Sequence, residues 1–211
     1  MTNKLVAYIG ILGVSLFAIA AIVGPLLIDD YSVVSQYISE SFASDTAYGW
    51  YLQYFGYVPS GILITIFCFS APNYFPSSKL IVSGFFGLAL FYGLGTVLVG
   101  FFPCDAGCPT DVIDSSLSQL IHNAMGSLTY IFLPISIVGV GVGLKKMEGY
   151  YRLSQIAMAT AIISGIFIFI LFSNPESDYR GILQRVIETS FIIWIISSAL
   201  TIKKYVSVTS K

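Results

Sequence analysis

The sequence predicts an all-α fold: a polytopic membrane protein with a single domain over residues 1–211, built as a six-helix transmembrane bundle. The first observation is composition, since 56% of the residues are hydrophobic and only 10% are charged, against about 25% charged in soluble domains. The second is a series of apolar runs long enough to cross roughly 30 Å of hydrocarbon. The third is that basic residues occupy alternate loops between these runs.

Apolar runs of roughly 20 residues, the length that a membrane-spanning helix needs, recur along the whole chain. They cover residues 5–28, 50–70, 80–102, 117–144, 153–173 and 181–202. Little sequence remains between them for a module outside the bilayer. The near balance of 10 Lys and Arg against 11 Asp and Glu argues against a nucleic-acid partner, which would need a strongly basic surface.

The charges of the loops predict the orientation. One set of loops and both chain ends carry the basic residues Lys4, Lys79, Lys145, Lys146, Arg152, Lys203, Lys204 and Lys211. The opposite loops carry Asp29, Asp30, Glu40, Asp45, Asp105, Asp111, Asp114, Glu176 and Asp178, with Arg180 as their one basic residue. Because Lys and Arg mark the cytoplasmic side, we predict a protein of the cell membrane with both termini in the cytoplasm.

The first run has two features of a cleaved signal peptide, namely Lys4 before it and the small residues Ala18 and Ala20 within it. Its apolar residues nevertheless continue through Pro25 to Ile28. Removal of this helix would also break the alternation of charge between the loops. We therefore predict that the helix is retained.

The first outer loop predicts a short amphipathic helix over residues 31–42. Its apolar residues recur at helical spacing and are Val33, Val34, Tyr37, Ile38 and Phe42. Its other face carries Ser32, Ser35, Gln36, Ser39 and Glu40. Such a helix lies on the membrane surface, either as an interfacial anchor or as a lid whose polar face closes a site.

The second, third and fifth helices indicate packing more than chemistry. Aromatic rings of the kind that form interfacial belts lie at the outer ends of the second and third helices: Trp50, Tyr51, Tyr54, Tyr57, Phe101 and Phe102. Glycines of the third and fourth helices let backbones approach closely: Gly84, Gly87, Gly93, Gly95, Gly139, Gly141 and Gly143. The fifth helix carries few polar residues and is predicted to be structural.

A loop with two cysteines joins the third helix, which ends at Pro103, to the fourth. Oxidising conditions outside a membrane favour a disulfide between Cys104 and Cys108, and Gly107 makes the turn permissive. A zinc site with Cys104, Cys108 and His122 as ligands is the alternative, but these residues form no recognised zinc spacing. We predict the disulfide, and neither a metal nor another cofactor.

Ionisable residues inside the last helix indicate a site. Glu188 lies roughly 12 Å below Arg180 at 1.5 Å per residue, where a charge costs about 2.5–3.5 kcal/mol on insertion scales. Arg185 lies three residues before Glu188 on the same helix face, and Gln184 lies one turn above Glu188. An ion pair between Arg185 and Glu188 is therefore expected.

The fourth helix presents a second polar face at the same depth, formed by Gln119, His122, Asn123 and Gly126. Because polar faces are costly towards lipid, we expect the two faces to meet. His122, Arg185 and Glu188 are then predicted to form one hydrogen-bonded unit and are the candidate catalytic residues. The candidate ligand-binding residues are Ser39, Glu40, Gln119, Asn123 and Gln184.

The chain resembles the prokaryotic membrane family called domain of unknown function 998. The matching pieces are Ile-Ser-Glu at 38–40, Gly-Phe-Phe-Pro-Cys-Asp-Ala-Gly-Cys at 100–108, Ile-His-Asn at 121–123, Gly-Ile-Leu-Gln-Arg at 181–185, Glu188 and Trp194. More distantly, the six-helix plan with Ile-Ser-acidic after the first helix is similar to the eukaryotic autophagy-modulator and GPI-remodelling (Frag1-like) membrane proteins. The resemblance implies a shared outward-facing polar cluster and no particular reaction.

These observations predict an outward-facing polar pocket in the outer half of the bundle that binds a membrane lipid head group or a small amphiphile. An intramembrane lipid hydrolase or acyl transferase is the alternative, with His122 as base and a serine, Ser35 or Ser39, close to it. Its carboxylate would be Glu40 or Glu188. A transporter or channel is a further alternative, although no broken helix pair or repeat is visible. The sequence does not decide whether the protein is an enzyme.

Overall fold

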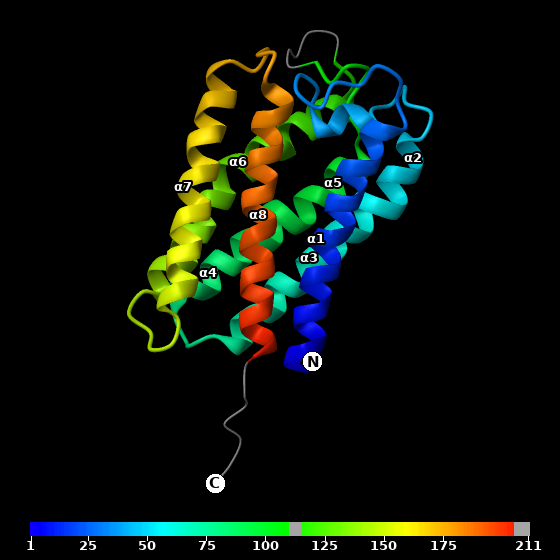
Figure 1. Ribbon diagram of the computed structural model, residues 1–211. Helices are drawn as coiled ribbons and strands as arrows, with labels where there is room; N and C mark the ends of the chain where they lie inside the picture. The colour runs from blue at the N-terminus through cyan, green and yellow to red at the C-terminus, as the bar shows by residue number, and fades with distance from the viewer. Residues whose placement is uncertain (110–114, 205–211) are drawn as a thin grey trace.

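The computed structural model describes residues 1–109 and 115–204. Within them, 6 helices are long and apolar enough to cross a membrane. They are Asn3–Leu26, Gly49–Tyr74, Lys79–Phe101, Leu117–Leu144, Tyr151–Ser173 and Arg180–Lys203. Each of them overlaps one predicted run, so the helical multi-pass fold is confirmed. Figure 1 shows these helices bundled along one long axis.

Several spans are built from more than one helical element. In chain order the elements are α1 (Asn3–Leu26), η1 (Ile38–Phe42), α2 (Gly49–Leu52), η2 (Gln53–Tyr57), α3 (Val58–Ser70), η3 (Ala71–Tyr74), α4 (Lys79–Gly87), η4 (Leu88–Leu94), α5 (Gly95–Phe101), α6 (Leu117–Leu144), α7 (Tyr151–Ser173) and α8 (Arg180–Lys203). The short elements η1 and η3 are 3₁₀ helices. In contrast, η2 and η4 are π-helical segments inside the second and third spans. π-Helical segments are rare overall, and those that occur often lie at functional sites.

The two ends of the bundle differ in which chain segments they hold. Asn3 Nδ2 donates a hydrogen bond to the carbonyl of Lys203 at 3.2 Å, so the start of α1 and the end of α8 lie together. We call this the terminal end and the opposite one the distal end (Figure 1). The distal end holds the loops of residues 27–48 and 174–179, and the described residues 102–109 and 115–116 between α5 and α6. Asp111, Asp114 and Lys211, used above to predict orientation, lie outside the described residues.

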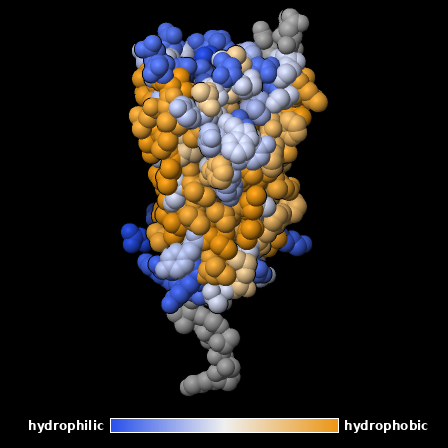
Figure 2. All heavy atoms as spheres, turned by 90° about the vertical axis from the view of Figure 1, so that its right-hand side faces the viewer, coloured by the Kyte–Doolittle hydropathy of each residue, from blue (hydrophilic) through white to orange (hydrophobic). Residues whose placement is uncertain are grey.

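The surface of the molecule carries the pattern of a membrane protein. Figure 2 shows an apolar band between two hydrophilic ends. Large apolar side chains of the spans are exposed, among them Phe169 of α7 at 72% and Ile22 of α1 at 65%. In water such a continuous apolar surface would be a liability, whereas lipid tails solvate it without cost. The protein is therefore a multi-pass membrane protein.

The core lies along the bundle axis. Trp194 of α8 is fully buried and its ring lies 6.3 Å from that of Phe85 in α4. Around it, α8 packs between α1 and α7, α6 packs on α4 and α7, and α3 packs on α1. Val6 and Ala7 of α1 are completely buried in this core, so the first helix is an integral part of the described bundle.

The second and third spans approach each other closely at two glycines, Gly61 and Gly93. A Cβ on Gly61 of α3 would lie 2.6 Å from the carbonyl oxygen of Gly93 in η4, and one on Gly93 would lie 2.7 Å from the amide nitrogen of Thr65. These neighbours are backbone atoms and cannot rotate away. The contact therefore requires glycine on both helices, as close packing of membrane helices often does.

The short helix expected in the first outer loop is present, but it is shorter and more deeply seated than its periodicity indicates. Only Ile38–Phe42 is helical, as the 3₁₀ element η1, and the preceding residues form turns. Val33 and Val34, predicted to lie on its apolar face, are 46% and 37% exposed. By contrast Glu40, predicted on the polar face, is buried. The reason is that basic side chains of α8 bind the backbone of this loop, as described below.

The Gly61 contact generates a stability prediction. We expect Gly61→Ala to destabilise the folded protein by about 1–3 kcal/mol, because the new methyl group forces two backbones apart. Gly165→Ala in α7 is the matched control, since a Cβ there meets nothing within 4 Å. Thermal unfolding in detergent would measure both variants. Equal unfolding temperatures for the two would contradict this account of the contact.

Candidate functional site

The loop of residues 27–48, here the first distal loop, is bound to the start of α8 by Arg185. Its guanidinium donates to the carbonyl oxygens of Val33 at 3.0 Å and Gln36 at 2.9 Å, and to the hydroxyl of Tyr31 at 3.2 Å. Turns leave carbonyl groups without partners, and arginine offers five N–H donors in a fixed fork. Arg185 therefore satisfies a stretch of backbone that the 3₁₀ element does not reach.

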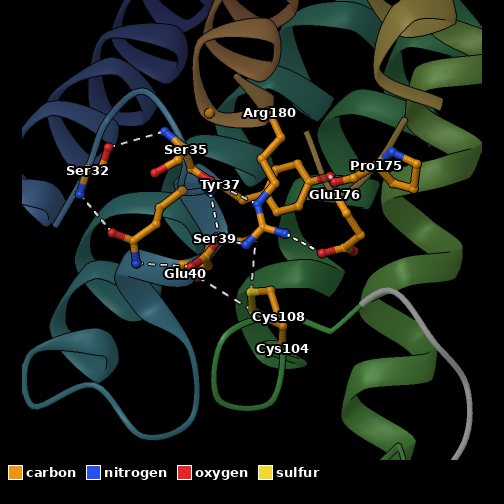
Figure 3. A network of polar contacts seen from close by, with 12 residues as sticks. Ser32, Ser35, Tyr37, Ser39, Glu40, Cys104, Cys108, Pro175, Glu176 and Arg180 are labelled. Carbon is orange, nitrogen blue, oxygen red and sulfur yellow. Dashed lines mark hydrogen bonds and ion pairs between the residues drawn. A yellow bond between two sulfur atoms is a disulfide. The ribbon is translucent and has the colours of Figure 1, made fainter. Parts of the chain in front are cut away.

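Arg180 joins the same loop to the last distal loop, residues 174–179 (Figure 3). It donates to the carbonyl of Ser35 at 2.9 Å and forms ion pairs with Glu40 at 3.4 Å and Glu176 at 2.9 Å. Its guanidinium also lies 4.9 Å from the centre of the Tyr37 ring. Glu40 is the more buried of the two carboxylates, with 6% of its side chain exposed against 63% for Glu176.

The Glu40 carboxylate closes the turn of its own loop. Oε1 accepts a hydrogen bond from the amide of Tyr37 at 2.8 Å, and Oε2 accepts one from Gln36 Nε2 at 3.0 Å. Tyr37 in turn donates its hydroxyl to the carbonyl of Pro175 at 2.8 Å. Burial raises the pKa of Tyr37 to about 12, with nearby Arg180 opposing that rise. The phenol is therefore neutral, and a donor, at physiological pH.

The first turn of α8 touches the first distal loop directly. The amide of Ile182 donates to the carbonyl of Val34 at 3.1 Å, and Gln184 Oε1 accepts from the amide of Ile38 at 2.6 Å. A Cβ on Gly181 would lie 2.4 Å from the carbonyl oxygen of Gln36. Glycine at this position lets the loop lie against the helix backbone.

The predicted hydrogen-bonded unit of His122, Arg185 and Glu188 is wrong. Arg185 points to the loop carbonyls described above, whereas Glu188 Oε1 accepts a hydrogen bond from the Tyr130 hydroxyl at 3.1 Å. His122 Nδ1 lies 3.0 Å from the carbonyl oxygen of Phe102. The shared helix face did not produce an ion pair because loop carbonyls near the surface supply enough acceptors for the arginine.

The loop that carries Cys104 and Cys108 packs beside the first distal loop. Cys104 and Cys108 are joined by a disulfide, as predicted. Gly107 between them has a φ of 74°, the left-handed region that glycine adopts without strain. Cys108 Sγ lies 3.4 Å from the Ser39 hydroxyl, so the loop packs on η1. Because the two sulfurs are bonded to each other, they are not thiolates available to zinc.

Gln119 of α6 holds this loop in position. Its Oε1 accepts from the amide of Asp105 at 2.6 Å, and its Nε2 donates to the carbonyl of Pro109 and to Asn123 Oδ1, both at 2.9 Å. Gln119 is fully buried. The structure thus gives Gln119 loop contacts, whereas the sequence predicted it as a ligand-binding residue.

Asp105 binds the start of α6. Its carboxylate accepts hydrogen bonds from the amide and hydroxyl of Ser116, at 2.9 and 2.6 Å. Ser116 is the N-cap residue of α6 and accepts from the amide of Gln119. These hydrogen bonds lower the pKa of Asp105 below its ordinary value of 3.8.

A pocket of about 440 Å³ opens between the first distal loop and helices α6, α7 and α8. This volume lies in the range of small-molecule sites. Its lining mixes polar and apolar groups: Tyr37, Ser39, Cys108, His122, Asn123, Gly126, Ser127, Tyr130, Leu171, Phe172, Pro175 and Gln184. We call it the outer pocket. Its α7 residues, Leu171 and Phe172, lie in the last turn of that helix.

A smaller cavity of about 80 Å³, the inner cavity, lies next to it and deeper in the bundle. Both share the lining residues Ser39, His122, Gly126, Tyr130 and Gln184. The inner cavity reaches Glu188 and is otherwise rich in aromatic rings, with Phe17, Phe42, Tyr57 and Tyr92 on its walls. The π-helical segments η2 and η4 contribute Tyr57 and Tyr92.

The structure thus brings five of the predicted site residues to these two cavities: Ser39, His122, Asn123, Gln184 and Glu188. Glu40, Gln119 and Arg185 are not lining residues of either cavity and instead hold the loops around them. Sequence reasoning missed Arg180 and the tyrosines. Tyr130 had a usable signal, because it follows His122 and Gly126 at intervals of four residues on one helix face.

The fold and the two cavities define a polytopic helical membrane protein with a polar pocket near one surface. The chain belongs to the family described as protein of unknown function (DUF998), whose model matches residues 11–201. No curated protein and no solved structure matches the chain. The more distant similarity to Frag1-like proteins therefore stays a prediction.

The two carboxylates that pair with Arg180, those of Glu40 and Glu176, allow a matched test. We expect Glu40→Gln to destabilise the protein by about 1–3 kcal/mol, because an amide cannot accept from Tyr37, Gln36 and Arg180 together and leaves buried donors unpaired. Glu176→Gln should change stability by less than about 0.5 kcal/mol, as exposed ion pairs contribute little. Thermal unfolding in detergent measures both. A larger loss for Glu176→Gln would overturn the assignment of Glu40 as the buried partner.

Asp105 predicts an acid-dependent loss of stability. Its folded pKa is depressed, so its contribution is present above about pH 4 and is lost as pH falls through the folded value. We expect Asp105→Asn to be less stable than the wild-type protein at pH 6, and the difference to shrink at pH 3. Unfolding temperatures across this range test it. A difference that stays constant with pH would show that the carboxylate charge is not involved.

Proposed function

We propose that this protein binds a lipid head group or a small amphiphile in the outer pocket. The observation that carries the proposal is the mixed lining of a pocket of about 440 Å³. Ser39, Asn123 and Gln184 provide hydrogen-bonding groups, while Leu171 and Phe172 of α7 provide apolar contact beside the lipid-facing band. An amphiphile has the same two-part chemistry, so one molecule can satisfy both parts of the wall.

The proposal includes location and orientation. We infer a protein of the cell membrane whose terminal end faces the cytoplasm and whose pocket opens to the outer side. Lys79, Lys146 and Arg152 lie at the terminal end, while Asp105, Glu176 and Asp178 lie at the distal end. The distribution supports this orientation because Lys and Arg mark the cytoplasmic side.

Binding is favoured over hydrolysis or acyl transfer by the surroundings of His122. Its Nδ1 faces the carbonyl of Phe102, and Ser39 Oγ lies against the disulfide sulfur of Cys108. A nucleophile activated by a base would show the two side chains within hydrogen-bond reach. No such contact is present among the described residues. The enzyme alternative therefore has no geometric support, and we do not propose it.

A pocket-filling substitution tests the binding proposal. A Cβ on Gly126, which lines both cavities, meets nothing within 4 Å, and the same is true of Gly165 outside them. We expect Gly126→Leu to lower the amount of co-purifying lipid or amphiphile at least about tenfold, equivalent to about 1.4 kcal/mol. Native mass spectrometry of protein released from detergent measures it. The matched control Gly165→Leu should retain wild-type amounts, and equal retention by both variants would contradict the proposal.

Orientation can be tested with an impermeant thiol reagent on intact cells. Asp178 and Lys146 are both exposed, in loops at opposite ends of the bundle. We expect Asp178→Cys to be labelled directly and Lys146→Cys only after permeabilisation. The native cysteines give a low background, since Cys68 is buried and the other two are bridged. Labelling of Lys146→Cys alone in intact cells would reverse the proposed orientation.

A further inference from the structure

We propose that the inner cavity binds a primary ammonium group, so that the amphiphile held by the outer pocket is an amine. This inference rests on the proposed function, because the outer pocket supplies the path and the place for the rest of the molecule. It is carried by the buried oxygens of the inner cavity, by the absence of Lys and Arg from its described lining, and by its aromatic walls.

Three buried oxygens of the inner cavity form no hydrogen bond of normal geometry among the described residues, although the Tyr92 hydroxyl faces the Glu188 carboxylate and the Tyr57 hydroxyl faces Ser41. The three oxygens are Glu188 Oε2, Tyr57 Oη and Tyr92 Oη. Their residues are 7%, 1% and 1% exposed, and all three line the inner cavity. An unpaired polar atom in such a place costs about 1–3 kcal/mol. A bound group that donates hydrogen bonds would remove this cost. An ionised carboxylate oxygen can only accept hydrogen bonds, so its partner must be a donor.

The charge of the cavity favours a cation. Among the residues that the structure describes, Glu188 is the one carboxylate that lines it, and no Lys or Arg lines either cavity. The two nearest arginines of α8 are engaged elsewhere, Arg180 with Glu40 and Glu176 and Arg185 with loop carbonyls. An anionic phosphate would therefore meet a carboxylate and no cation here, whereas an ammonium group would neutralise a buried charge.

The number of donors distinguishes a primary ammonium from a quaternary one. A primary ammonium group, like that of lysine, carries three N–H donors. A quaternary ammonium group carries none. The cavity offers three unpaired oxygens, which a trimethylammonium group would leave unpaired. The size agrees, since about 80 Å³ is only a few times the share of one water molecule in the liquid, about 30 Å³.

Aromatic rings complete the cage. The Tyr57 ring lies 4.3 Å from that of Phe42 and 5.3 Å from that of Phe17, and the Tyr92 ring lies 6.2 Å from that of Phe17. Faces of aromatic rings attract cations, by about 2 kcal/mol or more where the site is dry. The rings therefore strengthen the preference for a cation while excluding water.

The ligand has two possible sources, an aminolipid of the membrane or a water-soluble amine. Four probes distinguish them: decylamine, decyltrimethylammonium, decanol and ethanolamine. Binding is measured by thermal shift of the detergent-purified protein, with phosphatidylethanolamine against phosphatidylcholine compared by native mass spectrometry. Sodium chloride at the same ionic strength controls for a metal cation in the cavity.

We expect decylamine to bind at least about tenfold more tightly than decyltrimethylammonium or decanol, and phosphatidylethanolamine to be retained over phosphatidylcholine. Tyr57→Phe and Tyr92→Phe should each lower affinity for decylamine about threefold or more and leave decanol binding unchanged. Both variants should fold, because each removes a single hydroxyl that forms no hydrogen bond of normal geometry among the described residues. Glu188→Gln should lose the preference for the amine, and if it does not fold the two tyrosine variants decide.

The outcomes separate this inference from the proposed function. Equal binding of all three decyl probes, sensitive to Gly126→Leu, would overturn the ammonium site and leave the amphiphile pocket intact. Stabilisation by sodium with no response to amines would overturn it in favour of a metal cation. Absence of binding by every probe and lipid would overturn both proposals. Tight binding of ethanolamine alone would support the ammonium site while overturning the amphiphile pocket.

Discussion

The distal end of this protein depends on the binding of one loop's backbone by two arginines of α8. Arg185 donates to the carbonyls of Val33 and Gln36, and Arg180 donates to that of Ser35 while pairing with Glu40. The loop residues before η1 lack the regular hydrogen bonds of a helix, and buried backbone groups need partners. Without these contacts η1 would have no fixed position, and Ser39 would not lie above His122 as a wall shared by both cavities.

The interior below that loop contains buried polar groups that lower the stability of a membrane protein. Glu188 lies deep in α8 with one carboxylate oxygen paired to Tyr130 and the other unpaired among the described residues. A charge at such depth costs about 2.5–3.5 kcal/mol on insertion scales. Tyr57 and Tyr92 add unpaired hydroxyls. The ligand proposed above would supply hydrogen-bond donors to this cluster, whereas apolar side chains would pack the same space at lower cost.

Much of the fold could be predicted because its physical causes are local. Apolar runs of spanning length predicted the six spans, and the outward position of the loop that carries Cys104 and Cys108 predicted the disulfide. Part of the site could also be predicted, because α6 and α8 carry polar residues at the same depth. Of these, His122 and Glu188 do line the same cavity.

The remainder depends on interactions that the sequence pattern does not carry. Arg185 and Glu188 share a helix face, but competition from the carbonyls of a distant loop decides where the arginine points. Tyr57 was read as a belt residue and Tyr92 was not singled out, because the π-helical segments that carry them are not visible in the sequence pattern. The periodicity of residues 31–42 predicted a longer helix on the surface. It could not show the contacts with Arg180 and Gly181 of α8 that hold this loop in turns.

The central claim is that the two cavities together hold one amphiphile with its head group at Glu188. An experimental structure of the protein in nanodiscs made from its native membrane would test this most directly. The account predicts elongated density that enters beside Leu171 and Phe172 and ends within hydrogen-bond distance of Glu188 Oε2. Cavities occupied by water alone, or closed by inward movement of the Tyr57 and Tyr92 rings, would contradict it.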